Sequence, residues 1–170
     1  MDVRLAVASR REVRDYADRP IPEDEVQRIL EAGRISGSSK NRQPWRFYVV
    51  EDPDVRDRVA GSVYAPDNVR GAPLAIAIAV SGKGPTSFDA GRAAQNIMLA
   101  AWNDGIGACP NGVADAEAMR TVLGLAEGES VVTVLSLGYP AHPREADRRS
   151  PEEWIARADR KPLEEIVEHR

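Results

Sequence analysis

The 170-residue chain contains one cysteine and two histidines, and this scarcity excludes several kinds of site. Cys109 has no partner for a disulfide within the chain. A lone cysteine between alanine and proline is most often an inert small apolar residue, and no second cysteine or histidine is close in sequence to activate its thiol. His142 and His169 are too far apart in sequence for a metal cluster. We therefore expect neither a disulfide, a metal centre nor a redox-active thiol.

Long apolar runs and an excess of positive charge are also missing. No apolar segment reaches the roughly 20 residues that cross a bilayer, and residues 1–4 lack the apolar stretch of a signal peptide. Acidic residues outnumber basic ones, 27 to 23, with a formal net charge of −4, whereas a protein that binds nucleic acid needs a basic face. We expect a cytoplasmic protein that binds neither membrane nor nucleic acid and folds as one domain, residues 1–170.

Apolar periodicity predicts helices interspersed with strands. We expect helices at 2–9, 22–33, 53–62, 87–103 and 115–123 and from 151, and strands at 46–50, 74–80 and 131–137. Within 74–80 the large aliphatic residues fall on one face and the alanines on the other, which indicates a central strand approached closely by a neighbouring element. Residues 63–72 are expected to be irregular because Pro66 and Gly71 interrupt them.

The helix expected at 87–103 is apolar around nearly its whole circumference. A helix of this kind must be buried on all sides. In a domain of this size, that pattern predicts that a second subunit covers the helix together with the sheet of its own chain.

Two segments carry the polar groups that a ligand needs. The stretch GSSKNRQPW at 37–45 is too polar for a helix or a strand and leads directly into an apolar strand, so it is either a surface loop of turn-forming residues or a ligand-binding loop. Arg10, Arg11 and Arg14 place three guanidinium groups within five residues. They form either a solvated basic patch or a site for a phosphate and a polar ring edge, which guanidinium forks bind well.

Four stretches together resemble the nitroreductase family. They are SRREVRDY at 9–16, GSSKNRQPW at 37–45, GIGACPNG at 105–112 and GYP at 138–140, in that family's order and spacing. The resemblance covers nearly the whole chain. It implies an α+β fold with a mixed, mostly antiparallel sheet of four or five strands, helices on both faces, and an intertwined homodimer with flavin mononucleotide (FMN) at the subunit interface.

The resemblance also implies a set of flavin contacts. Arg10 and Arg149 would bind the phosphate, with Arg148 as the alternate to Arg149, and Arg14 would face the pyrimidine edge. Ser38, Ser39 and Asn41 would contact the flavin bound mainly by the other subunit. The main chain of Pro110, Asn111 and Gly112 would lie along the isoalloxazine ring, with an N–H near N5. The candidate flavin-binding residues are Arg10, Arg11, Glu12, Arg14, Ser38, Ser39, Asn41, Gln43, Asn68, Pro110, Asn111, Gly112, Arg148 and Arg149.

Three positions within this set need separate readings. Glu12 stands where the family usually has serine or threonine. Its carboxylate either accepts from the flavin N3–H or the ribityl hydroxyls, or turns outward to pair with an arginine. Asn68 is the counterpart we expect for a family lysine or asparagine that touches the ring. Trp45, directly before a strand, is read as part of the core and not as a stacking partner.

The activity implied is hydride transfer from NAD(P)H to the flavin, followed by reduction of an electron-poor acceptor such as a nitroaromatic or a quinone, in ping-pong fashion. Solvent can supply the protons, so no general acid is required. Two alternatives stay open. The same fold performs other flavin chemistry in relatives, including azoline oxidation, dehalogenation, cleavage of reduced flavin and reduction by a deazaflavin. The chain could also be a flavin- or nucleotide-binding module without turnover.

Overall fold

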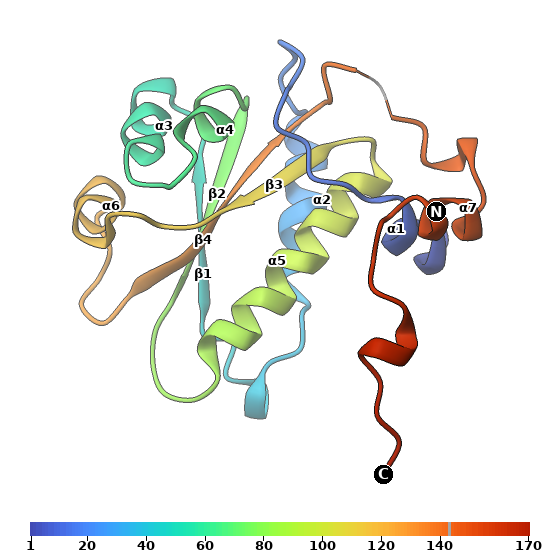
Figure 1. Ribbon diagram of the computed structural model, residues 1–170. Coiled ribbons are helices and arrows are strands. Elements are labelled where there is room, and N and C mark those ends of the chain that lie inside the picture. The colour runs from blue at the N-terminus through green and yellow to red at the C-terminus, as the bar shows by residue number, and fades with distance from the viewer. Residues whose placement is uncertain (143) are drawn as a thin grey trace. The chain divides into compact units, whose positions relative to one another are not determined.

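The computed structural model describes residues 1–142 and 144–170, and the chain divides into two compact units (Figure 1). One unit is Arg11–Arg144, and the other joins Met1–Arg10 with Glu145–Arg170. The single domain over 1–170 stays a prediction. Within the described residues, none of the helices combines the length and the apolar character needed to traverse a bilayer.

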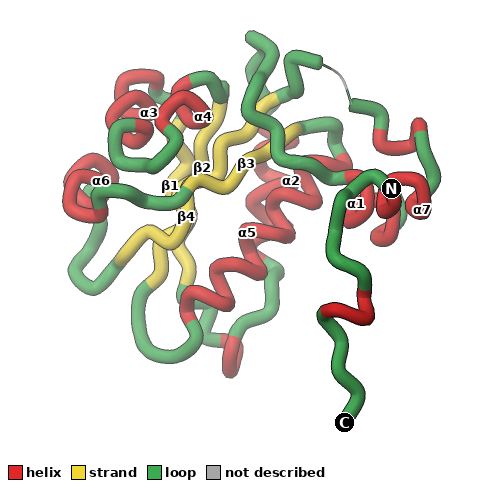
Figure 2. The backbone as a smooth tube through the Cα atoms, in the orientation of Figure 1, coloured by secondary structure: helices red, strands yellow, loops and turns green. Residues whose placement is uncertain are grey.

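The larger unit is built on a four-stranded sheet (Figure 2). The strands are β1 (Trp45–Val50), β2 (Leu74–Val80), β3 (Gly107–Asn111) and β4 (Ser130–Gly138), in the spatial order β1-β2-β4-β3. All three strand pairings are antiparallel, and a parallel pairing occurs as an isolated bridge between Glu12 and Ala108. The expected α+β class and mostly antiparallel sheet are therefore confirmed.

Helices cover both faces of this sheet (Figure 1). On one face, α2 (Glu23–Arg34) and α5 (Thr86–Asn103) pack against the large residues of β2, including Ile76 and Ile78. On the other face lie α3 (Pro53–Ala60), α4 (Pro66–Arg70) and α6 (Ala116–Leu123), which pack against Ala75 and Ala77. Every residue of β2 is buried, so the alternation of large and small side chains identified the central strand correctly.

Much of the burial of α5 comes from its own chain, so its composition alone does not require a second subunit. Ile97 has no exposed surface, whereas Phe88 is 68% exposed and Leu99 is half-buried, so coverage of α5 by a second subunit stays a prediction. The exposed face of α5 carries Gly91, Arg92, Gln95 and Asn96. The chain's own sheet and α2 close the apolar face, helped by Gly33, where a Cβ would lie 2.8 Å from Cδ1 of Ile97. Gly33 therefore lies inside α2 for packing reasons and does not end that helix.

Two segments differ from the expectation drawn from local composition. Residues 63–72 include α4, because Pro66 takes the first helical turn, where its missing N–H is not needed. The segment 107–111 forms β3, although its Gly-Ala-Cys-Pro-Asn composition is poor for a strand. Gly107 is required there because a Cβ would lie 2.5 Å from the side chain of Val13.

The smaller unit consists of short helices. It contains α1 (Val3–Ser9), η2 (Ala146–Arg148), α7 (Pro151–Ala156) and η3 (Leu163–Glu165), and α1 packs against α7. Ser150 starts α7 with a reciprocal cap, in which its Oγ accepts from the Glu153 N–H and the Glu153 carboxylate accepts from the Ser150 N–H. Trp154 Nε1 donates to the carbonyl of Ala146 at 2.8 Å, which fixes η2 beside α7.

Candidate functional site

The 38–43 loop connects the end of α2 to β1 and carries unusual backbone geometry. Lys40, Asn41 and Gln43 have φ values of 53°, 55° and 50°, in the left-handed region that side-chain-bearing residues rarely adopt. Such conformations cost roughly 1–3 kcal/mol each and persist where surrounding contacts hold them. The single turn of helix here, η1 (Ser39–Asn41), is too short to supply that support by itself.

Two side chains clamp this loop. Ser38 Oγ accepts from the Gln43 N–H at 2.9 Å and so closes the loop on itself. Asp89, in the first turn of α5, accepts from the Ser39 N–H at 3.0 Å. The Asp89 carboxylate is buried, and its nearest cation is Arg92, with Nη1 at 3.9 Å. The loop is therefore tied to the amino-terminal end of α5, which leaves the side chains of Asn41 and Gln43 exposed.

The sequence analysis did not identify Asp89. The available signal was a single carboxylate in the first turn of an otherwise apolar helix, where an acidic side chain also interacts well with the helix dipole. That position does not by itself reveal that the carboxylate reaches a loop 50 residues earlier in the chain.

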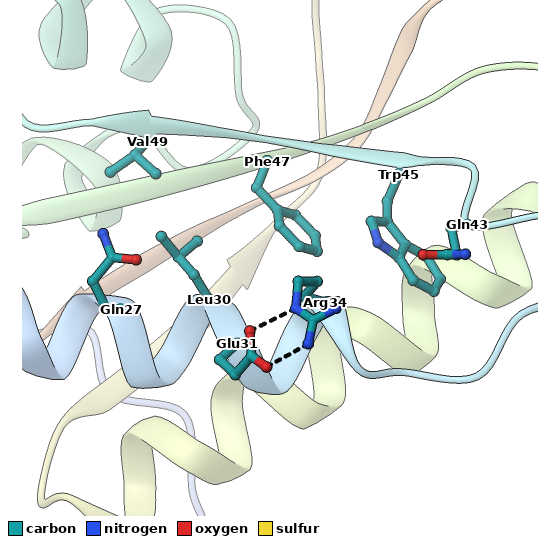
Figure 3. Close-up of a pocket in the computed structure, with 8 residues that line it drawn as sticks. All are labelled: Gln27, Leu30, Glu31, Arg34, Gln43, Trp45, Phe47 and Val49. Atoms are coloured by element: carbon teal, nitrogen blue, oxygen red, sulfur yellow. Dashed lines mark hydrogen bonds and ion pairs between the residues drawn. The ribbon is translucent and has the colours of Figure 1, made fainter.

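Trp45 follows the loop and belongs to a packed face of β1. Its ring stacks on that of Phe47, with centroids 6.4 Å apart, and both pack against the core that includes α2. These rings line a groove of about 450 Å³ between α2 and β1, which is the outer strand of the sheet (Figure 3). An ion pair between Glu31 and Arg34 lies on the helix side of the groove. These contacts agree with the structural role expected for Trp45.

The arginine-rich segment from residue 11 lies along β3. The Val13 N–H donates to the carbonyl of Ala108 at 3.2 Å, and Val13 is buried beside Gly107. The side chain of Arg14 is exposed. Glu12 is half-buried, and its carboxylate oxygen Oε2 is inaccessible to solvent, so the side chain does not simply turn outward.

A buried hydrogen-bond network supports the end of β3. Asn111 Nδ2 donates to the carbonyls of Cys109 and Val134, at 3.0 and 3.1 Å, and to Ser136 Oγ at 3.2 Å. Since carbonyls only accept, this arrangement fixes which end of the amide is the nitrogen. Asn111 Oδ1 must then face Asn68, whose Nδ2 donates to it at 3.0 Å. The hydrogen bonds of the Asn111 side chain therefore hold it in the interior of the fold.

Tyr16 completes this network from the amino-terminal segment. Its hydroxyl lies 2.6 Å from the carbonyl of Val13 and 2.9 Å from Ser136 Oγ. Burial raises the pKa of Tyr16 well above its usual range, so the phenol stays protonated and able to donate. Cys109 is buried in the same region, which suits the small apolar residue expected there. Residues 13–16 and 109–111 are therefore held together as one rigid element.

Pro110 and Gly112 are exposed on either side of the inward-facing Asn111. Tyr64 lies over Gly112: its N–H donates to the Gly112 carbonyl at 3.0 Å, and a Cβ on Gly112 would lie 3.2 Å from its ring. Tyr64 is 78% exposed, and the sequence analysis did not single it out. An aromatic residue this exposed, beside accessible main chain, is a candidate contact for a planar ligand.

Two groups of candidate residues in the larger unit lie at opposite ends of α5, namely the 38–43 loop and the segment that begins at Arg11 (Figure 1). The 38–43 loop is bonded to the first turn of α5, whereas β3, paired with Glu12, starts just beyond its last turn. An 18-residue helix is roughly 27 Å long. Within one chain, the 38–43 loop and Glu12 are therefore separated by about the length of α5.

The remaining candidates belong to the smaller unit. Arg10 is half-buried at the end of α1, and Arg148 is exposed at the end of η2. The Arg149 guanidinium lies over the Trp154 ring at 4.9 Å, a cation–π contact that limits its motion. Because α1 also packs against η2, the three candidate phosphate ligands belong to one packed unit.

Comparison with known proteins identifies the family. The family model described as "Nitroreductase family" matches residues 7–66 and 62–139. A protein of Archaeoglobus fulgidus, provisionally named NADH dehydrogenase/NAD(P)H nitroreductase, is 34% identical over 84% of this chain and 90% of its own length. A protein of Methanothermobacter thermautotrophicus with the same provisional name is 33% identical over 83% of this chain and 78% of its own length. The chain belongs to the nitroreductase family.

Solved structures agree with this assignment. The structure of a provisionally named nitroreductase of Desulfovibrio desulfuricans, in complex with FMN, superposes with a TM-score of 0.84 at 28% identity, covering 100% of this chain and 98% of that one. An FMN-dependent nitroreductase of Clostridium difficile gives a TM-score of 0.78 at 25% identity, covering 82% of this chain and 88% of that one. The nitroreductase fold is thus confirmed, and the structural relatives include proteins that bind FMN.

Proposed function

We propose that this protein is an FMN-dependent oxidoreductase that takes hydride from NAD(P)H and reduces an electron-poor acceptor, such as a nitroaromatic or a quinone, in ping-pong fashion in the cytoplasm. The flavin supplies the redox chemistry when bound, and the protein binds, orients and tunes it. The coarser assignment, to an oxidoreductase family with NAD(P)H nitroreductase relatives, rests on the comparisons.

The end of β3 is the observation that carries the proposal. A flat ring lying along main chain needs accessible peptide groups. Pro110 and Gly112 are exposed, while the Asn111 side chain is turned inward by three donated hydrogen bonds. The main chain at 110–112 is thus not covered by the Asn111 side chain and is supported by its hydrogen bonds, and the exposed Tyr64 ring lies over Gly112 as a further contact, which fits the isoalloxazine contact expected there.

Charged and polar side chains supply the other contacts in this proposal. Arg14, exposed beside β3, holds a positive charge at the pyrimidine edge and favours the reduced ring, which carries more negative charge. Arg10 and Arg149 bind the phosphate through charge-assisted hydrogen bonds, with Arg148 as the alternate to Arg149. Arg11 adds positive charge within the same stretch.

The proposed active form is a homodimer with shared flavin sites. The two groups of candidate residues lie at opposite ends of α5, so Ser38, Ser39 and Asn41 act on the flavin of a second subunit, with Gln43 in the same loop. The exposed outer edge of β1, with its groove against α2, offers a surface that a second copy can cover. The exposed Phe88 of α5 adds a further apolar group that a second copy can cover.

An absorbance spectrum of the purified protein, followed by anaerobic titration with NADH and NADPH, tests the function. We expect a yellow protein whose colour bleaches with at least one nucleotide and returns with a quinone or a nitroaromatic. Bleaching by neither nucleotide would instead favour the other flavin chemistries or the binding module. Light scattering tests the dimer, for which we expect a mass near twice 18.6 kDa. A stable monomer that retains flavin would exclude the shared site.

A further inference from the structure

A second, polar cavity lies beside the 38–43 loop, and the function proposed so far gives no role to the cationic residues that line it. Its volume is about 320 Å³, and it opens between the start of β1 and the turn that follows β2. The Ser81 N–H donates to the carbonyl of Pro44 at 3.1 Å and holds these two segments together. Three cationic side chains line the cavity: Arg42, Arg46 and Lys83.

One carboxylate also lines the cavity, and its charge is already matched. Glu129 accepts from Arg46 Nε at 3.1 Å, from the Tyr48 hydroxyl at 2.7 Å and from the Ala126 N–H at 3.0 Å. The hydrogen bond from Tyr48 holds the pKa of Glu129 below its usual range, so the group is ionised at neutral pH. Glu129 and Arg46 therefore neutralise each other in the cavity wall.

Arg42 and Lys83 keep their positive charge unmatched. Arg42 Nη1 donates to the carbonyl of Lys83 at 3.2 Å. Within residues 1–142 and 144–170, no carboxylate lies at ion-pair distance from either side chain. The cavity thus carries two unpaired cations in a chain whose net charge is −4. These two positive charges therefore favour the binding of an anionic ligand in the cavity.

The position of Arg42 is constrained by the fold. The clamps at Ser38 and Asp89 fix the loop that carries it. On the other side, Gly84 has a φ of +110°, and a Cβ there would lie 2.6 Å from Arg42 Nη1. The guanidinium therefore packs directly on the backbone of the turn after β2, and the positive φ of Gly84 favours the residue that leaves room for it. A planar guanidinium held this way is preorganised for phosphate oxygens.

We propose that this cavity binds a phosphate monoester, namely the 2′-phosphate of NADPH, and that Arg42 and Lys83 make the enzyme prefer NADPH over NADH. The inference rests on the proposed function, because the same loop carries Ser38, Ser39 and Asn41, which are proposed to contact the flavin. The nucleotide would therefore be anchored next to the ring that it reduces. The phosphate of the flavin itself is assigned to other arginines, in the smaller unit.

The test compares two double variants of the flavin-loaded protein. Arg42→Gln with Lys83→Gln removes both cations of the cavity. Arg58→Gln with Lys161→Gln is the matched control, because it changes the net charge equally at exposed positions elsewhere. The measured quantity is kcat/KM for NADPH divided by kcat/KM for NADH, with one acceptor. We expect this ratio to fall about tenfold or more in the cavity variant, since charge-assisted contacts are lost, and to stay at the wild-type value in the control. An unchanged ratio in the cavity variant overturns the inference.

The single variant Lys83→Gln separates the loss of a cation from a folding defect of the double variant. It should fold normally because no described side-chain contact depends on Lys83. It should lower the same ratio by a smaller factor without changing the melting temperature. A second arm compares inhibition by 2′,5′-ADP and by 5′-AMP. Wild type should be inhibited more strongly by 2′,5′-ADP, and the cavity double variant should lose that difference; equal inhibition of wild type by both compounds counts against the inference.

A third arm identifies the source of the phosphate. If the cavity variant loses its preference for FMN over riboflavin, the cavity holds the flavin phosphate and the inference is overturned. These results are distinguishable from failure of the proposed function. A protein that binds no flavin, or whose flavin neither nucleotide reduces, rejects that function. A flavoprotein reduced by both nucleotides with an unaltered ratio rejects the cavity assignment alone.

Discussion

The end of β3 is held by uncharged hydrogen bonds inside the fold, whereas the 38–43 loop is held largely by one buried carboxylate and carries backbone strain. Around Asn111, the donors and acceptors belong to amides, a hydroxyl and main-chain carbonyls. In the loop, three residues have left-handed φ values, and the link to the rest of the fold passes through Asp89.

This difference predicts different sensitivities for the two segments. A buried network in which every amide is hydrogen-bonded is structurally rigid, but removing one of its side chains breaks several hydrogen bonds at once. A strained loop clamped at two points can shift locally without unfolding the sheet, because its residues are mostly exposed. Substitutions at the end of β3 should therefore mainly lower the free energy of unfolding, and substitutions in the loop should mainly lower ligand affinity.

The largest expected effect comes from Asn111→Leu, which keeps a similar size but removes every polar contact of the amide. The carbonyls of Cys109 and Val134 and the amide of Asn68 then each lose the hydrogen bond that they share with Asn111. We expect the free energy of unfolding to fall by about 3–5 kcal/mol, which lowers the melting temperature by roughly 10 °C. Urea and thermal unfolding measure this, with exposed Gln95→Leu as the control. Equal stability of the two variants would show that the network does not support β3.

Asp89→Asn should have the opposite effect, with a small loss of stability and a larger loss of FMN affinity. It keeps the shape of the side chain but removes the charge that holds the Ser39 N–H. We expect the free energy of unfolding to fall by about 1 kcal/mol and FMN affinity to fall by roughly tenfold, since a hydrogen bond to a charged group is worth about 1.5–3 kcal/mol. Fluorescence titration of the apoprotein with FMN and urea unfolding separate the two quantities. Exposed Asp54→Asn is the control. A large loss of stability with normal FMN affinity would reverse the comparison.

Local sequence was sufficient to predict the elements whose stability is decided locally. Asp115 accepts from the Glu117 and Ala118 N–H groups, and Gly124 ends that helix with a φ of +59°. Both features depend on residues within a few positions of each other. The strand at 74–80 was likewise predicted from its own alternation, because a central strand must be apolar on both faces.

The features that the sequence did not reveal depend on partners far away in the chain. The segment 107–111 becomes a strand because β4 supplies the hydrogen bonds, despite its glycine and proline. The inward turn of Asn111 depends on Val134 and Ser136, and the clamp at Asp89 on Ser39. The four family-like stretches located the candidate residues, but neither their spacing nor their composition indicates which side chains support the others.

Arg14 and Glu12 sharpen the comparison because their segment lies along β3, where both side chains can tune the flavin. Removing the positive charge in Arg14→Ala should make the bound flavin harder to reduce. For a two-electron couple about 30 mV corresponds to about 1.4 kcal/mol, so one partly screened charge should lower the midpoint potential by some tens of millivolts. Glu12→Ser should raise the potential, because its carboxylate is partly buried against this segment.

Anaerobic redox titration of the flavin-loaded protein measures both potentials. Arg58→Ala, which removes an exposed arginine from α3, is the control for the change in net charge. A wild-type potential in Arg14→Ala would remove Arg14 from the ring edge. A wild-type potential in Glu12→Ser would mean that the carboxylate does not face the ring.

The smallest expected effect tests the strain in the loop directly. Lys40 has φ 53° and ψ 27°, a conformation that glycine adopts freely and other residues adopt at a cost of roughly 1–2 kcal/mol. Lys40→Gly relieves that strain, whereas Lys40→Ala removes the same side chain and retains it. Since glycine also gains freedom in the unfolded chain, we expect the glycine variant to be more stable than the alanine variant by about 1 kcal/mol or less. Urea unfolding of the two variants measures the difference. Gly124→Ala, which imposes a side chain on a left-handed residue, should lose stability by a similar amount and calibrates the scale. If the two Lys40 variants are equally stable, the loop stores no strain, and its clamps serve only to place it.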